Sequence, residues 1–223
     1  MKSTQITEAE FFRHVDHSLL KPQLTRQEVL EGLRYAKENR CASVCINPHN
    51  LDLAAEVLAG TDVKIGTVIG FPSGAHTTIT KVMESKDAYS RGAVELDMVI
   101  DIGALKSGLT DRVREDIRAV CEATPAIVKV ILETAYLTNE EIVLGSRIAE
   151  EAGAAYVKTS TGFASAGATV ENVRLMRQSV SEKVKVKAAG GMHTLEECLA
   201  LMEAGADRLG ISRTKEIVSE FGK

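Results

Sequence analysis

The sequence predicts one closed (β/α)8 barrel over residues 1–223. Short apolar segments alternate with helix-like segments along almost the whole chain, and they recur roughly every 25–30 residues, the length of one strand and its returning helix. A chain of 223 residues also suits a single large core. The alternative is an open doubly wound sheet, which usually has a Gly-x-Gly-x-x-Gly turn after its first strand, and no such turn follows the first strand here. No linker or low-complexity run divides the chain, so we expect one domain.

Each apolar segment is assigned to a strand and each interval to a helix. The eight strands are expected at 13–17, 42–46, 63–69, 94–99, 126–132, 155–159, 184–188 and 207–210. Three helices are expected to begin at threonines that precede acidic residues, which suits helix N-termini: Thr25, Thr138 and Thr194. A short helix at 8–12 is expected to close the bottom of the barrel.

The composition excludes several classes of protein. There are 27 basic and 31 acidic residues without a basic stripe, no Trp and only 4% aromatic residues, so we expect no nucleic-acid partner. The polar N-terminus lacks the apolar centre of a signal peptide, and no segment approaches the roughly 18 apolar residues of a membrane span. The cysteines do not form two close pairs that would make a zinc site, and reduced thiols in a cytoplasmic protein are expected.

Three lysines, at 129, 158 and 187, are spaced 29 residues apart, each within an apolar run. We expect them to occupy matching places on three neighbouring strands. A lone strand lysine usually reaches water at an edge, but three in phase indicate amine chemistry. A buried amine beside a second ammonium loses its proton more easily, so one lysine can attack a carbonyl while the other stays charged. Lys185 shares a face with Lys187 and is expected to reach water at the strand start.

Carboxylates on neighbouring strands are candidates for proton transfer. Asp97 is expected to face the barrel interior and to pair with Lys129 on the next strand, either as a proton shuttle or as a structural ion pair. Asp16 occupies a comparable place on the first strand. His14 and His17 are three residues apart on a strand and face opposite sides, so no catalytic metal is expected.

Glycines after the seventh and eighth strands predict a phosphate site. Gly190 and Gly191 follow one strand, and Gly210 and Ser212 follow the other, at the place where barrels often bind phosphate through backbone N–H groups. Gly162, after the sixth strand, is expected to extend this pocket. Arg208, next to Asp207, is expected at a strand start and not in the site.

Seven stretches together resemble the family of 2-deoxyribose-5-phosphate aldolases of the short bacterial type. They are 15–20, 43–48, 67–72, 95–100, 129–134, 157–163 and 186–191. The run Val-Lys-Thr-Ser-Thr-Gly-Phe at 157–163 is the most specific of them. The resemblance implies a class I aldolase that reversibly cleaves 2-deoxy-D-ribose 5-phosphate to acetaldehyde and D-glyceraldehyde 3-phosphate, with no cofactor and no metal. It also implies small-molecule partners only, and often a homodimer.

The resemblance implies a role for each matching residue. Lys158 would form the Schiff base, Lys187 would lower its pKa, and Asp97 would donate and accept protons. The pocket would also contain Asp16, Cys45 and Lys129. The phosphate would be bound by Gly162, Gly190, Gly191 and Ser212.

The chain departs from the family pattern in three places. It has His193 where an Arg often follows the paired glycines, Arg213 where some relatives have a second Ser, and no terminal Tyr at 220–223. Two other interpretations stay open. One is a phosphate-binding isomerase or metal-dependent lyase whose lysines act only as electrostatic clamps, and the other is a barrel without catalytic activity.

Overall fold

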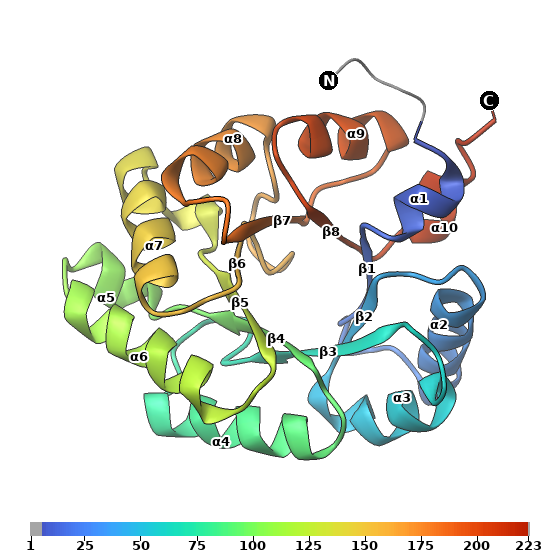
Figure 1. Ribbon diagram of the computed structural model, residues 1–223, viewed down its shortest axis with the longest axis horizontal. Helices are drawn as coiled ribbons and strands as arrows, with labels where there is room; N and C mark the ends of the chain where they lie inside the picture. Colours follow the sequence, from blue (N-terminus) through green and yellow to red (C-terminus); the bar gives the residue numbers. More distant parts are fainter. Residues whose placement is uncertain (1–5, 223) are drawn as a thin grey trace.

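The computed structural model describes residues 6–222, which form a closed barrel of eight parallel strands surrounded by helices (Figure 1). Each strand pairs with its neighbours in chain order, and β8 pairs with β1 to close the ring. The predicted fold class is therefore confirmed. Because all eight strands run in one direction, their carboxyl ends meet at one end of the barrel, where such folds carry their sites.

All eight predicted strands are present, with small differences at their ends. They are β1 (Val15–Leu19), β2 (Ser43–Ile46), β3 (Lys64–Ile69), β4 (Glu95–Val99), β5 (Ile127–Ile131), β6 (Tyr156–Lys158), β7 (Lys185–Ala189) and β8 (Arg208–Ile211).

The helices fill the intervals as predicted. The α-helices are α1 (Glu8–Phe12), α2 (Arg26–Glu38), α3 (Leu51–Leu58), α4 (Thr78–Ser90), α5 (Ile102–Lys106), α6 (Thr110–Ala123), α7 (Asn139–Glu151), α8 (Val170–Ser179), α9 (Leu195–Glu203) and α10 (Thr214–Val218). Two short 3₁₀ turns, η1 (Pro48–Asn50) and η2 (Thr134–Tyr136), follow β2 and β5.

The first strand begins two residues later than predicted. The N–H groups of Arg13 and His14 donate to carbonyls of α1, at 3.0 and 2.9 Å, so the helical turn continues to His14. The short helix itself is confirmed, but it does not close the barrel bottom. It lies beside α10 at the edge of the ring (Figure 1), where Phe11 packs against Phe221 with ring centroids 5.5 Å apart. This contact buries Phe11 at the outside of the ring, so the helix does not cover the opening of the barrel.

The three predicted helix starts are confirmed. The hydroxyls of Thr25, Thr138 and Thr194 each accept a hydrogen bond from the backbone of a Glu three residues later, and that Glu accepts in return from the threonine backbone. Each such cap contributes roughly 1 kcal/mol. The caps determine where α2, α7 and α9 begin, and so the length of the loops that lead into them.

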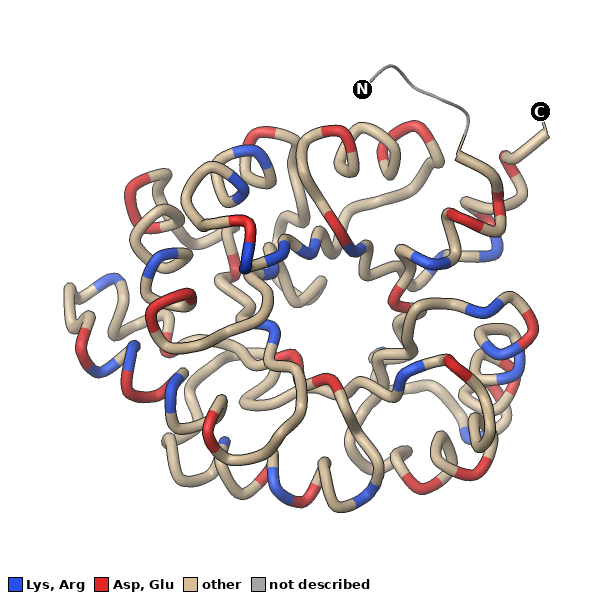
Figure 2. Tube along the Cα trace, in the orientation of Figure 1, with Lys and Arg blue, Asp and Glu red and all other residues tan. Residues whose placement is uncertain are grey.

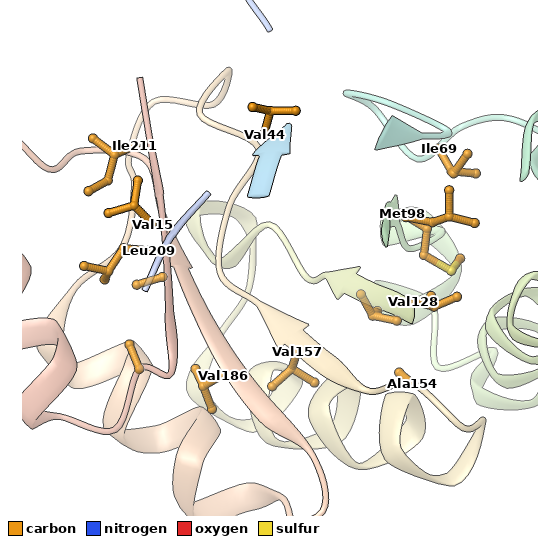
Figure 3. Close-up of a cluster of buried hydrophobic side chains, with 14 of the residues drawn as sticks. Val15, Val44, Ile69, Met98, Val128, Ala154, Val157, Val186, Leu209 and Ile211 are labelled. Atoms are coloured by element: carbon orange, nitrogen blue, oxygen red, sulfur yellow. The ribbon is translucent and has the colours of Figure 1, made fainter. Parts of the chain in front are cut away.

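The main apolar core lies between the strands and the surrounding helices (Figure 3). Val157 of β6 and Val186 of β7 are fully buried in it. Because successive strand residues point to opposite faces, their neighbours Lys158 and Lys187 point to the barrel interior. Figure 2 shows charged residues on the outer helices and also on segments around the central opening. The apolar core thus lies between the strands and the helices, and the interior of the barrel is charged.

His17, on the helix side of β1, makes stability depend on pH. Burial, together with nearby Lys215, lowers its pKa from 6.5 to about 4, and its Nδ1 lies 2.9 Å from Thr214 Oγ1. The unfolded chain binds a proton below pH 6.5 and the folded protein only near pH 4, so stability is lost as the pH falls through this window. We expect about 2 kcal/mol of unfolding free energy to be lost at this residue between pH 7.5 and pH 5. Urea unfolding of His17→Gln, compared with the unchanged protein at both pH values, should show that much less pH dependence. An equal pH dependence in both proteins would contradict the assignment.

The helices among residues 6–222 include none with the length and apolar character needed to cross a bilayer.

Candidate active site

Two lysines face each other across adjacent strands at the carboxyl end of the barrel. Lys158 is the last residue of β6, and its Cα is paired directly with that of Lys187 on β7. Their exposed fractions are 2% and 0%. The prediction that these two amines are strand neighbours is confirmed.

Lys129 does not occupy the matching place that the equal spacing predicted. On β5 it is level with Tyr156, and Ile131 is the residue level with Lys158. Lys129 therefore lies two residues deeper in the barrel than the other two lysines. Strands in a closed barrel must be staggered, so equal distances in sequence do not produce equal heights.

Asp97 on β4 connects all three amines. Its Oδ2 accepts hydrogen bonds from Lys158 Nζ at 2.6 Å and from Lys187 Nζ at 2.7 Å. Its Oδ1 lies 3.1 Å from Lys129 Nζ, and the strand register places Asp97 beside Lys129 as predicted. Because Lys158 and Lys187 share one oxygen atom, a proton that leaves one amine has a short route through Asp97.

A second, deeper layer of charges holds this arrangement from below. Asp16 Oδ2 lies 2.5 Å from Lys187 Nζ and 3.0 Å from Lys129 Nζ. Its Oδ1 accepts from Arg208 and, at 2.6 Å, from the Ser43 hydroxyl. Both oxygens of Asp16 are therefore bonded, and this carboxylate supports Lys187 and Lys129 from below.

Glu95 and Arg208 also belong to this layer, and sequence reasoning assigned neither to the site. Glu95 Oε2 lies 2.5 Å from Lys129 Nζ and 3.5 Å from Arg208 Nη1. Glu95 shares the inner face with Asp97 by alternation, which was a usable signal. Arg208 does begin β8 as predicted, but the expectation that it stays out of the site is wrong. Its long side chain reaches inward to the Asp16 carboxylate.

These seven side chains form what we call the inner ionic cluster: Asp16, Glu95, Asp97, Lys129, Lys158, Lys187 and Arg208. All are at most 8% exposed. The cluster has three carboxylates and four basic groups, so its charges balance only when one basic group is neutral. Lys64 is near it, 3.7 Å from Glu95, but its side chain is 45% exposed and screened by water.

The pKa shifts of the two paired lysines have opposite directions. Burial and the Lys187 ammonium lower the pKa of Lys158 against the opposing pull of Asp97. Burial would also lower the pKa of Lys187, but Asp16 and Asp97 raise it above the usual value. Lys187 thus stays charged, while Lys158 is the easier amine to deprotonate.

Asp97, Asp16 and Lys129 keep their charges. Burial by itself would raise the pKa of Asp97, but Lys129, Lys158 and Lys187 together hold it far below the usual range. The same balance between burial and neighbouring cations lowers the pKa of Asp16. Burial opposes the charge on Lys129, yet three carboxylates raise its pKa well above normal. Asp97 is therefore an anion in the free protein.

Cys45 lies at the edge of this cluster. Its Sγ is 3.8 Å from Asp97 Oδ2, and burial together with the Asp97 charge raises its pKa to about 11. It packs with Leu20 and Val68, and Phe71 covers them. The thiol therefore remains protonated and forms part of an apolar wall next to the amines.

The glycines predicted for phosphate line one cavity with Lys158. This cavity has a volume of about 210 Å³ and includes Gly162, Gly190, Gly191 and Ser212. The three glycines have φ of 86°, 78° and 77°, a region of backbone conformation that favours glycine. Phe163, also in the lining, meets Phe71 edge-on with ring centroids 5.3 Å apart.

Two of the three departures from the family pattern follow residues that line this cavity, His193 after Gly191 and Arg213 after Ser212. Arg213 precedes α10, is exposed, and its Nη1 lies 3.1 Å from His193 Nδ1. Among residues 6–222, no three His, Cys, Asp or Glu side chains are arranged to hold one metal ion. Residues 220–222 are described up to Gly222, and Lys223 lies outside the described residues.

Glu133 is a further residue that sequence reasoning missed. It is 1% exposed and adopts φ 58°, and its carboxylate accepts from the Thr161 hydroxyl and, at 3.2 Å, from the Thr161 backbone N–H. Burial raises its pKa. It ties the end of β5 to the loop after Lys158, which keeps Gly162 at the cavity.

A parallel barrel that holds a deprotonatable amine, a shared carboxylate and a glycine-lined cavity at its carboxyl end defines a class of protein, the barrel enzymes that work through an amine nucleophile. Comparison with known proteins specifies which one. A family model described as DeoC/LacD family aldolase matches residues 11–218. The chain belongs to this family of aldolases.

Individual relatives cover almost the whole chain. A deoxyribose-phosphate aldolase of Thermoanaerobacter sp. (strain X514) is 52% identical, over 94% of this chain and 96% of its own. One from Bacillus mycoides (strain KBAB4) is 51% identical, over 94% and 95%. Among solved structures, the aldolase QR15 is 43% identical with a TM-score of 0.90, covering 94% of this chain and 95% of that one. The tetrameric deoxyribose phosphate aldolase of Aeropyrum pernix is 27% identical with a TM-score of 0.89, covering 96% and 92%.

Proposed function

We propose that this protein is a class I aldolase that reversibly cleaves 2-deoxy-D-ribose 5-phosphate to acetaldehyde and D-glyceraldehyde 3-phosphate. The observation that carries the proposal is the Lys158 amine, which is buried, has a lowered pKa and lies 2.6 Å from the Asp97 carboxylate. The aldolase family and the named relatives support the same reaction.

The reaction begins when the neutral Lys158 amine attacks the C1 aldehyde of the open-chain sugar. Water leaves, the nitrogen takes up one proton from the solvent, and a protonated imine forms between Lys158 and C1. The C3 hydroxyl then gives its proton to Asp97, directly or through a water molecule, and the C2–C3 bond breaks. The bonding electrons pass to C2, C1 and the imine nitrogen, so D-glyceraldehyde 3-phosphate leaves and an enamine remains.

The second half restores the amine. The proton held at Asp97 is returned to C2 of the enamine, which yields the imine of acetaldehyde. Water adds to this imine, and acetaldehyde departs. Lys187 remains charged throughout, which keeps Lys158 deprotonatable and supplies a hydrogen-bond donor to Asp97. Asp16 and Lys129 hold Asp97 and Lys187 from below.

Reduction with borohydride tests the proposal. Incubation with acetaldehyde and borohydride should leave an ethyl group on Lys158, which peptide mass spectrometry locates. Exposed Lys185, two residues before Lys187 on β7, serves as an internal control because it is a lysine of ordinary environment. A label on another lysine, or none, together with sensitivity to a chelator, would favour the metal-dependent alternative over an imine mechanism.

The phosphate site makes a separate prediction. Ser212 lies in the cavity with Lys158, Gly190 and Gly191, and a carboxylate there would repel a phosphate dianion. We expect Ser212→Asp to raise the KM for 2-deoxyribose 5-phosphate about 100-fold and to change kcat little. Initial rates with this substrate and with 2-deoxyribose, which has no phosphate, make the comparison. Equal losses on both sugars would show that the substitution disturbs the chemistry and not a phosphate contact.

We also infer a cytoplasmic location and small-molecule partners only. Support comes from the free thiols of Cys41, Cys45, Cys121 and Cys198, which are typical of a reducing compartment. Assembly as a homodimer remains a prediction of the resemblance, and the Aeropyrum pernix relative is described as a tetramer. Light scattering of the purified protein would measure the assembly directly.

A further inference from the structure

A second cavity lies at the opposite end of the barrel from Lys158. It has a volume of about 530 Å³ and is lined by residues that precede or begin strands, among them Arg13 before β1, Ala42 before β2, Lys64 at the start of β3 and Arg208 at the start of β8. We call it the amino-end cavity. None of the reaction steps above uses it.

Positive charge dominates the lining of this cavity. Its charged residues are Arg13, Lys37, Arg40, Lys64, Arg208 and Asp62. Five cations face one carboxylate, so the lining has a formal charge of +4, although the whole chain has a net charge of -4. Such a concentration of one sign within a concave surface attracts ions of the opposite sign.

The cations at the rim are available to a ligand. Arg13, Lys37 and Arg40 are exposed, and Lys37 Nζ donates to a backbone carbonyl, that of Val57, at 3.1 Å. Arg40 is held at φ 52°, a left-handed conformation uncommon for residues other than glycine. The guanidinium groups of Arg13 and Arg40, both at this rim, have the geometry to donate paired hydrogen bonds to phosphate oxygens.

The floor of the amino-end cavity is the underside of the inner ionic cluster. Arg208, 8% exposed, lines the cavity and donates to Asp16. Lys64 lies 3.7 Å from Glu95 Oε1, a buried oxygen that has no hydrogen-bond partner among residues 6–222. Through these two side chains, a charge placed in the cavity is one residue away from the carboxylates that hold Lys129 and Lys187.

The size of the cavity indicates the class of ligand. A volume of about 530 Å³ falls within the range of about 300–1,000 Å³ usual for small-molecule sites. It is much larger than one phosphate ion. The charge of the lining calls for several negative charges on a compact molecule.

We propose that the amino-end cavity binds a small metabolite with two or more phosphate charges, and that this ligand slows the enzyme through Arg208. The ligand draws the guanidinium away from Asp16, which loosens the support of Lys187. It also adds negative charge below the cluster, which favours the protonated form of Lys158. Both effects reduce the rate of imine formation, and neither affects the substrate phosphate site at the other end.

Binding is tested first, with pyrophosphate as the probe and titration calorimetry as the measurement. The test variant is Arg13→Glu combined with Arg40→Asp, because Asp tolerates the left-handed conformation at position 40. The matched control is Arg26→Asp combined with Arg34→Glu, two exposed arginines of α2 outside the cavity, which changes the net charge equally. We expect the cavity variant to bind at least about tenfold more weakly, since each lost charged contact is worth about that factor. The control variant should bind as the unchanged protein does.

The coupling is tested by kinetics on the same three proteins. Pyrophosphate should lower kcat about fivefold or more in the unchanged protein and the control, the lower end of ordinary allosteric coupling, and leave KM unchanged. The cavity variant should keep its kcat in the presence of pyrophosphate.

Three results would overturn the inference. One is the absence of binding to the unchanged protein, and another is equal affinity in the cavity variant and the control. The third is inhibition that raises KM alone and disappears in Ser212→Asp, which would place the ion at the substrate phosphate site. The calorimetric result does not depend on the proposed reaction, so failure of this inference and failure of the aldolase assignment can be told apart.

Discussion

Replacing Lys158 with methionine is expected to lower turnover by about 10⁴-fold or more and to make the protein more stable. Methionine has a similar length and no charge, so the fold is retained while the nucleophile is lost. The amine is 2% exposed and is the fourth basic group among three carboxylates. Because burial lowers the pKa of this amine, the unfolded chain holds its proton more tightly than the folded protein does, which costs the folded state stability at neutral pH. Methionine removes that cost, and we expect the melting temperature to rise by roughly 2–4 °C, which corresponds to about 1 kcal/mol in a protein of this size.

The same change at Lys129 provides the contrast. Lys129 lies 3.0 Å from Asp16, 2.5 Å from Glu95 and 3.1 Å from Asp97, so Lys129→Met leaves three buried carboxylates short of positive charge. We expect it to destabilise the protein by about 3–5 kcal/mol. Thermal or urea unfolding of both variants under one set of conditions measures the difference.

The opposite changes in stability expected for Lys158→Met and Lys129→Met distinguish a nucleophilic role of Lys158 from a purely electrostatic one. If Lys158 were an electrostatic clamp, its replacement would cost as much stability as the replacement of Lys129. Equal destabilisation of the two variants would therefore favour the clamp interpretation and count against a neutral nucleophile at position 158.

The sequence allowed the strands to be predicted because apolar segments and helix caps are local signals. The 29-residue spacing placed Lys158 and Lys187 on neighbouring strands, and the two are paired there. The height of Lys129 was not predictable, because the register between β5 and β6 depends on barrel stagger. The number of residues between two strands does not determine that stagger.

Long side chains set a second limit on what the sequence can predict about the site. Arg208 was placed correctly at the start of β8, but its backbone position says nothing about how far the guanidinium reaches. Glu95 shares the inner face of β4 with Asp97 by alternation, but only the structure brings it within 2.5 Å of Lys129. The partners of buried charges come from strands far apart in sequence. The sequence pattern therefore indicates which charged residues are buried, but not which of them pair.

Lys187→Leu is the second substitution that we expect to change turnover strongly, because it removes a charge next to Lys158. In Lys187→Leu, Asp97 and Asp16 each lose a cation, at 2.7 and 2.5 Å, and their negative charge then favours the protonated form of Lys158. Activity needs the neutral Lys158 amine, so the rate rises as the pH passes upward through the pKa of that amine. A higher pKa moves this rising limb to higher pH. We expect turnover at pH 7 to fall at least about 100-fold and to recover partly under alkaline conditions.

The measurement is kcat/KM for cleavage from pH 6 to pH 10, because this ratio reports the pKa of the free enzyme. Lys185→Leu is the matched control, since it removes a lysine from the same strand and face but from an exposed position beside Tyr156. Its profile should match that of the unchanged protein. If the Lys187→Leu profile also keeps its position and only its height changes, then Lys187 serves the chemistry without tuning Lys158, and burial alone must account for the lowered pKa of that amine.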